Sequence, residues 1–505
     1  MTTEETPLLQ NSHDAVYDRF PSGRKKVLVF IVSLGALVTF FTSGTFIPTI
    51  PQIVEELDST KEVIRPYQRR SYAVGVYMLA NAVGSLVAAR YSSFYGRRPI
   101  YLWWFPVMII GSIGVANAQS VMSLMVWRFI QAAGSSPGLS VGAGVIGDIY
   151  KLEERGTALG IYLCTSLLGY ALAPTIGGVM AYYWSWRAIH VSIAAFCCAV
   201  LVSIVFFFPE TIHPGTKGLD RCERSGRVPS KVWPVMLNPL EQLALLRSPN
   251  ILVAAFLNYT GMLTDFALLV PLPYTIVRIT RVPRTYQPLI TLQPPHSRVN
   301  ATELRTKRCW ERAFSLLDWA KQVNVLFLHK QGAPITHIDP VGAPLAGWIS
   351  DKVVVKYKKK RGYWYPEDRL RASMFSCYLP LCVLGSALIT KYVPGRLGLT
   401  LNLICLFLNG VGCDIALTPY GTYVVDILHS KSAEVTAAVN TFRMIAVAGS
   451  TAVMLPMIDA YGYLFTSFVV AMVATAGLGL TIVMIAHGEA MRRWMDVGFS
   501  TAENN

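Results

Sequence analysis

About eleven long apolar runs dominate this sequence of 505 residues, and each is long enough to form a membrane-crossing helix. A bilayer core is about 30 Å thick, and roughly 20 apolar residues in a helix cross it. Only 15% of the residues are charged, whereas a soluble domain carries about 25%. Backbone polar groups in lipid must be bonded within the chain, which favours helices for runs of this length. The runs therefore predict an all-α, multi-pass integral membrane protein.

The runs fall into two groups on either side of a charged stretch rich in Pro and Gly. We expect a cytosolic tail over 1–26, a six-helix bundle over 27–208, a cytosolic linker over 209–248, a second bundle over 249–488 and a cytosolic tail over 489–505. The expected spans lie near 27–47, 70–89, 99–119, 121–147, 156–180, 188–208, 250–273, 372–390, 398–425, 434–457 and 462–486. Lys and Arg gather in alternate loops, which places both tails and the linker in the cytosol.

The segment 278–340 interrupts the second group, at the place where symmetry between the halves requires an eighth span. It carries ten Lys and Arg and four Asp and Glu, and a charge at the bilayer centre costs at least about 2.5 kcal/mol. The eighth span is therefore expected to be missing or degraded. Two explanations stand for this segment: an artefact of the gene model, such as translated intron, or a genuine extracellular insertion with Asn300 as a glycosylation site.

Several classes of protein are excluded by what the sequence lacks. It has no Walker loop, no Gly-rich nucleotide turn after a strand and no nucleophile elbow, so we expect neither an enzyme nor a cofactor. The nine cysteines are scattered singly, which predicts neither a disulfide framework nor a metal site. The net charge of +15 lies mainly in the cytosolic loops, so it predicts topology and not nucleic-acid binding.

The stretch 155–187 carries small residues at helical spacing. Gly169, Ala173 and Gly177 are four residues apart and share one helix face, so a neighbouring backbone can come close. Pro174 removes one backbone hydrogen bond and predicts a kink. The aromatic residues that follow, 182–186, predict a membrane–water boundary.

Six short motifs occur along the chain. They are Tyr95–Pro99 with Gly96, Arg97 and Arg98, preceded by Gly84; Trp127–Gly134 around Arg128; Gly169–Gly178 with Pro174 and Gly177; Phe208–Thr211; Gly342–Asp351; and Pro366–Arg369. In their order and spacing they resemble the motifs of the major facilitator superfamily, and within it the twelve-spanner drug:proton antiporter branch common in fungi. Two departures from that pattern are Ser93, where the family has an acid, and Ala173, where it has a glycine before Pro174.

The resemblance implies two six-helix bundles around a central cavity that opens alternately to the two sides. It also implies proton-coupled antiport, in which a small organic molecule such as a drug, an organic acid or a polyamine is exported. We expect a monomer whose partners are this substrate, protons and the lipid bilayer, in the plasma membrane or alternatively the vacuolar membrane. A non-transporting membrane protein, either a sensor or a decayed transporter paralogue, is the alternative. It would fit a missing eighth span, which in this family packs against the fifth, and the loss of the acid at Ser93.

Charged residues at the cytosolic ends of spans are candidates for a gate. Arg97 and Arg98 can form ion pairs with Asp148 or Glu153 and hold the inward gate shut, although positive-inside topology alone also accounts for the two arginines. Asp351 with Lys352 is the corresponding candidate in the second half.

Four charged residues lie inside apolar runs: Arg128, Asp265, Asp414 and Arg443. The resemblance implies that Arg128 takes part in proton coupling, and snorkelling to the outer interface is the alternative. A carboxyl group in an apolar site can bind and release a proton near neutral pH, so Asp265 and Asp414 are proton-coupling candidates, and Arg443 can pair with Asp414. Further candidates line the central cavity or, alternatively, pack in the core: Asn258, Tyr259, Tyr420 and Tyr423.

Overall fold

The computed structural model describes residues 17–57, 66–213, 215–224, 237–269, 339–363, 365–393, 395–428 and 431–494. In the first half the helices are α2 (Ser22–Leu57), α3 (Pro66–Tyr95), α4 (Arg97–Ala116), α5 (Val121–Ser135), α6 (Pro137–Ile149), α7 (Leu152–Tyr183) and α8 (Trp186–Phe207). The linker holds α9 (Gly218–Arg224) and the 3-10 helix η1 (Pro239–Arg247). In the second half they are α10 (Pro249–Leu269), α14 (Asp339–Arg361), η3 (Pro366–Asp368), α15 (Leu370–Ser373), η4 (Met374–Ser376), α16 (Leu379–Tyr392), α17 (Gly395–Ile427), α18 (Ser432–Tyr461) and α19 (Tyr463–Trp494).

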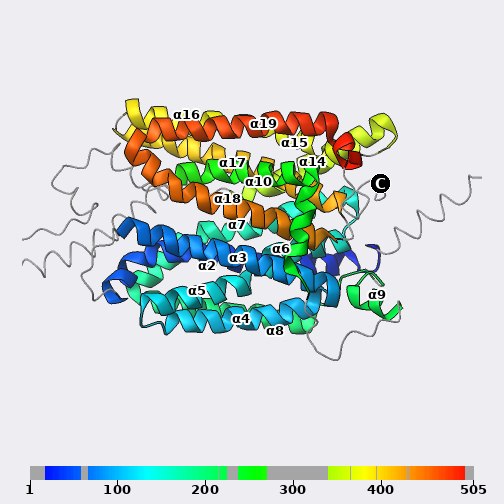
Figure 1. Ribbon diagram of the computed structural model, residues 1–505, viewed down its shortest axis with the longest axis horizontal. Coiled ribbons are helices and arrows are strands. Elements are labelled where there is room, and N and C mark those ends of the chain that lie inside the picture. The colour runs from blue at the N-terminus through cyan, green and yellow to red at the C-terminus, as the bar shows by residue number, and fades with distance from the viewer. Residues whose placement is uncertain are drawn as a thin grey trace, which may run out of the picture.

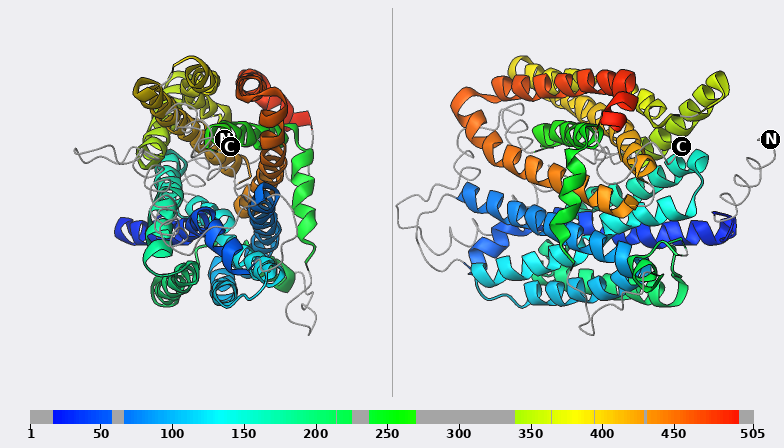
Figure 2. Two further views of the ribbon diagram at one scale, coloured as in Figure 1. Left: turned by 90° about the vertical axis from the view of Figure 1, so that its left-hand side faces the viewer. Right: turned by 45° about the vertical axis from the view of Figure 1, so that its right-hand side comes forward.

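The long helices run side by side in two bundles, one from each half of the chain (Figure 1). The start of α2, the linker helix α9 and the end of α19 lie at the same end of the molecule (Figures 1 and 2). This is the end expected in the cytosol, and it is called the cytosolic end below. Contacts between the bundles are made by α7 with α14, α3 with α18, and α6 with α17 and α18. The linker, expected to be a loop, contains two short helices, and its η1 contacts α3 as well as α10 and α18.

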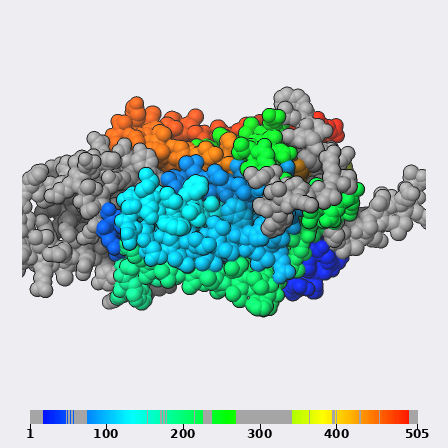
Figure 3. Space-filling model, turned by 60° about the horizontal axis from the view of Figure 1, so that its bottom comes forward, coloured from blue at the N-terminus to red at the C-terminus, as the bar shows by residue number. Residues whose placement is uncertain are grey.

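Within the part of the chain that the structure describes, eight helical segments are long and apolar enough to cross a membrane. Helices α4, α5 and α8 form the outer face of the first bundle (Figure 3), and they expose large apolar side chains. Ile110, Met122 and Phe206 are 56%, 74% and 75% exposed. In a water-soluble fold such a surface would drive aggregation, whereas in lipid it is matched to its solvent. The prediction of an integral, multi-pass membrane protein is therefore confirmed.

Two of the expected spans are broken helices. The run expected over 121–147 divides into α5 and α6 at Ser136, because Pro137 begins α6 and has no N–H to continue the hydrogen-bond ladder of α5. The run expected over 372–390 is also divided: α15 and η4 precede α16, which starts beside Pro380. In contrast, α7 is one helix from Leu152 to Tyr183, so Pro174 does not interrupt it. The side chains of Pro174 and Gly178 lie outside the described residues.

The small residues of α7 face two different neighbours. A Cβ placed on Gly169 would lie 2.5 Å from the carbonyl oxygen of Leu37 in α2, and Gly177 packs against Thr45 further along the same helix. On another face, a Cβ on Gly160 would lie 2.5 Å from the carbonyl oxygen of Ala343 in α14. The predicted close approach is therefore confirmed, and the run from Gly169 to Gly177 contacts α2.

Helix α14 lies where the eighth span is expected, packed against α7. Its Asp351 reaches the first turns of α7 at the cytosolic end, and its last turn carries Lys358, Lys359, Lys360 and Arg361. Asp339, where the described helix begins, lies twelve residues before Asp351, which is about 18 Å of helix at 1.5 Å per residue. Over its 23 residues α14 is about 34 Å long, and it packs against α7 as an eighth span would. The segment 278–340 and Asn300 lie outside the described residues, apart from the first two residues of α14.

The aromatic cluster after α7 is divided between surface and core. Tyr183 and Trp184 are 71% and 70% exposed, as expected of an interfacial belt, but Trp186 is buried. The indole of Trp186 donates a 2.6 Å hydrogen bond to Glu56 near the end of α2, and Arg187 forms an ion pair with the same carboxylate. This cluster joins the outer ends of α2 and α8.

The contact between α7 and α2 can be tested by adding one methyl group. Gly169→Ala is expected to lower the free energy of unfolding by about 1–3 kcal/mol, because backbone atoms of α2 occupy the space that the methyl group needs. Gly479→Ala is the matched control, since no atom lies within 4 Å of its added Cβ. Thermal unfolding of both variants in the same detergent measures the difference. Equal melting temperatures for the two variants would contradict this packing.

A pH dependence follows from Glu56, whose pKa is lowered below its ordinary value of 4.5 by the hydrogen bond from Trp186 and by Arg187. A lowered pKa stabilises the fold above the ordinary value, and this contribution is lost as the pH falls through the lowered one. The melting temperature of Glu56→Gln should therefore lie below that of the wild type at pH 7, and the gap should shrink below pH 4.5. Glu154→Gln, at an exposed position, is the control, and a gap that stays constant with pH would refute the assignment.

Candidate functional site

The turn between α3 and α4 is built around Gly96. Its φ of 114° favours glycine, and a side chain there would also collide with the carboxylate of Glu210. That carboxylate accepts hydrogen bonds from the backbone N–H groups of Arg97 (2.9 Å) and Thr211 (3.0 Å). Glu210, known from the sequence only as part of the motif that ends the sixth span, therefore ties the end of α8 to the start of α4.

Arg97 forms the predicted ion pair with Asp148. Its Nε lies 2.9 Å from Asp148 Oδ2, and both side chains are buried at the cytosolic end. A second donor of the guanidinium reaches Ser92 Oγ at 3.0 Å. Arg98 does not join this pair and donates instead to the carbonyl oxygen of Val205. The side chain of Glu153, the other predicted partner, lies outside the described residues.

A second and larger ion network joins the two halves of the chain. Arg155 at the start of α7 lies 2.6 Å from Asp426 at the end of α17. Asp426 also pairs with Arg369, whose Nη1 lies 2.9 Å from Asp351 of α14. Asp351 then accepts hydrogen bonds from the backbone N–H and the hydroxyl of Thr157, both at 2.7 Å. The network thus leaves the first half at Arg155 and returns to it at Thr157.

We name Arg155, Asp426, Arg369 and Asp351 the cytosolic latch. All four side chains are buried, and Gly156 has no room for a side chain because Asp351 and Arg369 fill the space beside it. The ion-pair partner of Asp351 is Arg369, while the ammonium of Lys352 lies 3.6 Å from the ring centre of Trp348. A gating role of Asp351 with Lys352 stays a prediction. Arg155 was not predicted. Asp426 was not predicted either; the signal that could have found it is the Asp-Ile pair at 426–427, which repeats the pair at 148–149.

The equivalent position in the first half lacks such a latch. Gly84 is followed nine residues later by Ser93, just as Gly342 is followed by Asp351, but Ser93 Oγ is buried without a hydrogen-bond partner among the described residues. The contact between α3 and α18 is instead held by Arg90, which lies 3.3 Å from Glu434 and also pairs with Glu241 of the linker. Gly84 packs against Ala133 and Ser136.

Arg128 lies inside the first bundle, about 10 Å along α5 from Val121 at 1.5 Å per residue. The guanidinium is fully buried, so it does not snorkel to the surface. It donates to the carbonyl oxygen of Thr42 (3.2 Å) and to Gln131 Oε1 (3.0 Å). The rings of Phe46 and Tyr77 lie 4.3 Å and 4.7 Å from it. No ion pair joins Arg128 to a carboxylate in the described part of the chain.

The acidic candidates of the second bundle lie on adjoining helices. Asp265 of α10 is half-buried and accepts a 2.7 Å hydrogen bond from the amide of Asn409 in α17. Asp414 of α17 is buried against α14, where a Cβ on Gly342 would lie 2.6 Å from Asp414 Oδ2. Gly342 therefore lets α14 approach this carboxyl group. The pairing of Arg443 with Asp414 stays a prediction.

The cavity candidates occupy different surroundings. Tyr420 and Tyr423 are buried in the apolar core of the second bundle, where they bond Thr481 (2.9 Å) and Glu367 (3.3 Å), so packing is the role that the structure favours for them. Asn258 is buried and donates to the carbonyl oxygen of Ala254 in its own helix. Tyr259 is half-buried and bonds Ser450 of α18 at 2.7 Å.

The latch can be tested by neutralising its shared acid. Asp426→Asn leaves two buried arginines without their common partner, and such a loss costs about 3–5 kcal/mol. We therefore expect the cytosolic ends of the bundles to separate. Ser432→Cys provides the reporter, because Ser432 is buried where α18 meets Gly147 of α6.

In the Ser432→Cys background, Asp426→Asn should raise the rate of alkylation by a thiol reagent at least about tenfold. Asp18→Asn is the matched control, since it breaks an exposed pair with Lys151 (3.2 Å) at the same end of the molecule and is expected to have little effect. Equal alkylation rates for Asp426→Asn and the control would show that the latch does not hold the bundles together.

The Major Facilitator Superfamily profile matches residues 32–280. The chain is 32% identical over 194 residues to the MFS antiporter QDR3 of Candida albicans, covering 38% of this chain and 27% of that protein. It is 31% identical over 205 residues to Citrate exporter 1 of Aspergillus niger, covering 41% of this chain and 38% of that protein. The matched part therefore spans well under half the length of either relative.

The fold is also similar to that of a solved transporter. The proton:xylose symporter XylE superposes with a TM-score of 0.61 at 13% identity, over 92% of this chain and 96% of that one. At this identity the likeness shows the fold alone. Together with the profile match, the two bundles and the motif order, it shows that the chain belongs to the major facilitator superfamily.

Proposed function

We propose that this transporter exports a small organic molecule in exchange for protons. The observation that carries the proposal is the cytosolic latch, which joins the two halves by buried ion pairs at one end of the molecule. Such pairs have two discrete states, made and broken, and that is what alternating access requires of a gate. The proposed partners are the substrate, protons and lipid, and the proposed site of action is the plasma membrane, as a monomer.

Proton coupling is proposed for Asp265 and Asp414. Both lie on helices that are apolar enough to span a membrane, and Asp265 accepts a 2.7 Å hydrogen bond from the amide of Asn409. A carboxyl group in such surroundings can exchange its proton when the conformation changes its access to water. Asp414 also contacts Gly342 of α14. A change in its protonation would therefore alter the packing of the helix that carries the latch residue Asp351.

For the substrate we propose an organic acid first. Arg128 is a buried cation without a carboxylate partner in the described part of the chain, and it bonds neutral oxygen atoms. A carboxylate that reached it would gain a charge-assisted hydrogen bond. The likeness to a citrate exporter points in the same direction. Drugs and polyamines remain in the substrate panel, and for a polyamine Arg128 would be repulsive.

A non-transporting membrane protein is the second candidate, and one observation favours it. The sequence over 278–340, where the family's eighth span would begin, carries ten Lys and Arg and four Asp and Glu. A receptor or a decayed paralogue can keep the latch and still move no substrate. Flux separates the two candidates.

Flux into proteoliposomes is the test, with an imposed pH difference and a panel of citrate, other organic acids, polyamines and cationic dyes. The proposal predicts that uptake of at least one organic acid depends on the pH difference. Asp414→Asn should abolish that dependence while leaving the protein folded, and Asp18→Asn should not. Wild-type protein that moves no member of the panel would favour the non-transporting candidate. Proton-driven flux that survives in Asp414→Asn would remove Asp414 from the coupling.

A further inference from the structure

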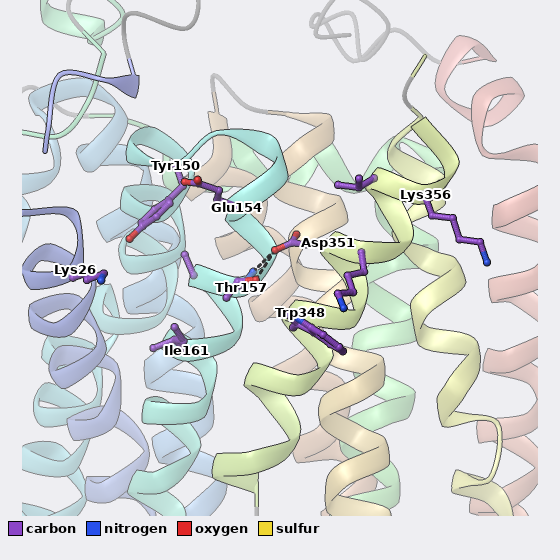
Figure 4. Close-up of a pocket in the computed structure, with 11 residues that line it drawn as sticks. Lys26, Tyr150, Glu154, Thr157, Ile161, Trp348, Asp351 and Lys356 are labelled. Atoms are coloured by element: carbon purple, nitrogen blue, oxygen red, sulfur yellow. Dashed lines mark hydrogen bonds between the residues drawn. The ribbon is translucent and has the colours of Figure 1, made fainter. Parts of the chain in front are cut away.

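A hollow of about 760 Å³ opens between the two bundles at the cytosolic end. It is bordered by the start of α2, the first three turns of α7 and the cytosolic half of α14, with Lys26 on one side and Trp348 and Lys356 on the other (Figure 4). Asp351 lies at its back, where the hydrogen bonds to Thr157 close the space between α7 and α14. The hollow therefore lies directly over the cytosolic latch.

The rim of the hollow is positively charged. Lys26, Lys352 and Lys356 are exposed there, and they come from both halves of the chain. Of the two acids that line it, Asp351 is already held by Arg369 and Thr157, which leaves Glu154 as the acid facing the three lysines. An anionic group in the hollow would thus meet an excess of positive charge supplied by both bundles.

The deeper wall of the hollow is apolar and faces the surroundings. Ile161, Trp348 and Val355 are 46%, 49% and 47% exposed. Lys352 lies over the Trp348 ring at 3.6 Å from its centre, so the indole presents its apolar body below a cationic rim. A ligand that fits this wall and this rim has an anionic head and an apolar body.

The level of the hollow in the membrane decides which amphiphile can occupy it. Lys26 lies in the first turns of α2, where the candidate span Ser22–Phe46 begins, and Tyr150 lies between α6 and α7. This is the headgroup level of the cytosolic leaflet, the leaflet that carries the anionic phospholipids. The acyl chains of such a lipid would lie along Ile161 and Val355.

We propose that this hollow binds the headgroup of an acidic phospholipid from the cytosolic leaflet. The lipid phosphate and its neighbouring anionic group would lie between Lys26 of the first bundle and Lys352 of the second, and Lys356 would add positive charge to the rim. Because the hollow is bordered by both bundles and lies over the closed latch, a lipid bound there would stabilise the latched state, as any ligand stabilises the state it binds more tightly. Binding itself does not depend on the proposed transport activity.

The test of binding uses the full chain in phosphatidylcholine nanodiscs with or without phosphatidylserine, and native mass spectrometry counts retained lipid. The triple variant Lys26→Gln, Lys352→Gln and Lys356→Gln should retain phosphatidylserine on the order of a hundredfold more weakly. The control Lys358→Gln, Lys359→Gln and Lys360→Gln removes the same charge from the last turn of α14, beyond the residues that line the hollow. Equal losses in the two variants would show that only the general basic charge of this end matters, and would overturn the proposal.

The test of regulation uses the Ser432→Cys reporter in the same nanodiscs. Phosphatidylserine should slow its alkylation in the otherwise wild-type protein and in the control variant, but not in the Lys26, Lys352 and Lys356 variant. Soluble glycerol phosphate should not reproduce the effect, because it lacks the apolar body that the wall contacts. An equal effect of glycerol phosphate, or none from phosphatidylserine, would contradict a lipid site. This readout needs no substrate, so its failure is separate from a failure of the proposed transport.

Discussion

The pairing of Arg155 with Asp426 is the interaction on which the rest of the structure depends. The two residues lie 271 positions apart in sequence and belong to different bundles, and both side chains are almost fully buried. A charge removed from water costs several kcal/mol unless partners replace the lost hydration. Asp426 recovers it from two arginines, and Asp351 recovers it from Arg369 and the N–H groups of α7. The two bundles are therefore held together by buried charged groups, and none of these groups can lose its partner without a large desolvation cost.

The two halves carry related charge pairs with different roles. The pair of Arg97 with Asp148 in the first half corresponds to the pair of Arg369 with Asp426 in the second. In each pair the arginine lies at the start of one span and the aspartate at the end of the next. The first pair stays within its bundle, whereas the second is shared with Arg155. The residue seven positions after Asp148 is Arg155, whereas the residue seven positions after Asp426 is Ala433. The second half therefore has no counterpart of Arg155 at this position. Together with Ser93 in place of an acid, this makes the gate asymmetric, with its cross-bundle charge on the side of α7 and α14.

The sequence predicted the membrane architecture well because burial in lipid leaves a long one-dimensional signal. It also predicted the pair of Arg97 with Asp148, since Arg97 begins one span and Asp148 ends the next at the same end of the bundle. It could not predict that Asp351 pairs with Arg369 and not with the adjacent Lys352, because this pairing depends on the direction in which each side chain points from α14. Trp186 was expected at the interface for its residue type, yet Glu56 holds it in the core. In the sequence Arg155 looks like an ordinary loop cation, and only the fold shows that α17 places Asp426 beside it.

The central claim is that the cytosolic ends of the bundles are held by the latch and can separate. The most direct measurement is the distance between spin labels on Arg24→Cys at the start of α2 and Lys359→Cys at the end of α14, in a background without other reactive cysteines. We predict a short and a longer population, with Asp426→Asn shifting the distribution to the longer one. A single distance, unchanged by Asp426→Asn, would show that these ion pairs are static packing and that the latch is not a gate.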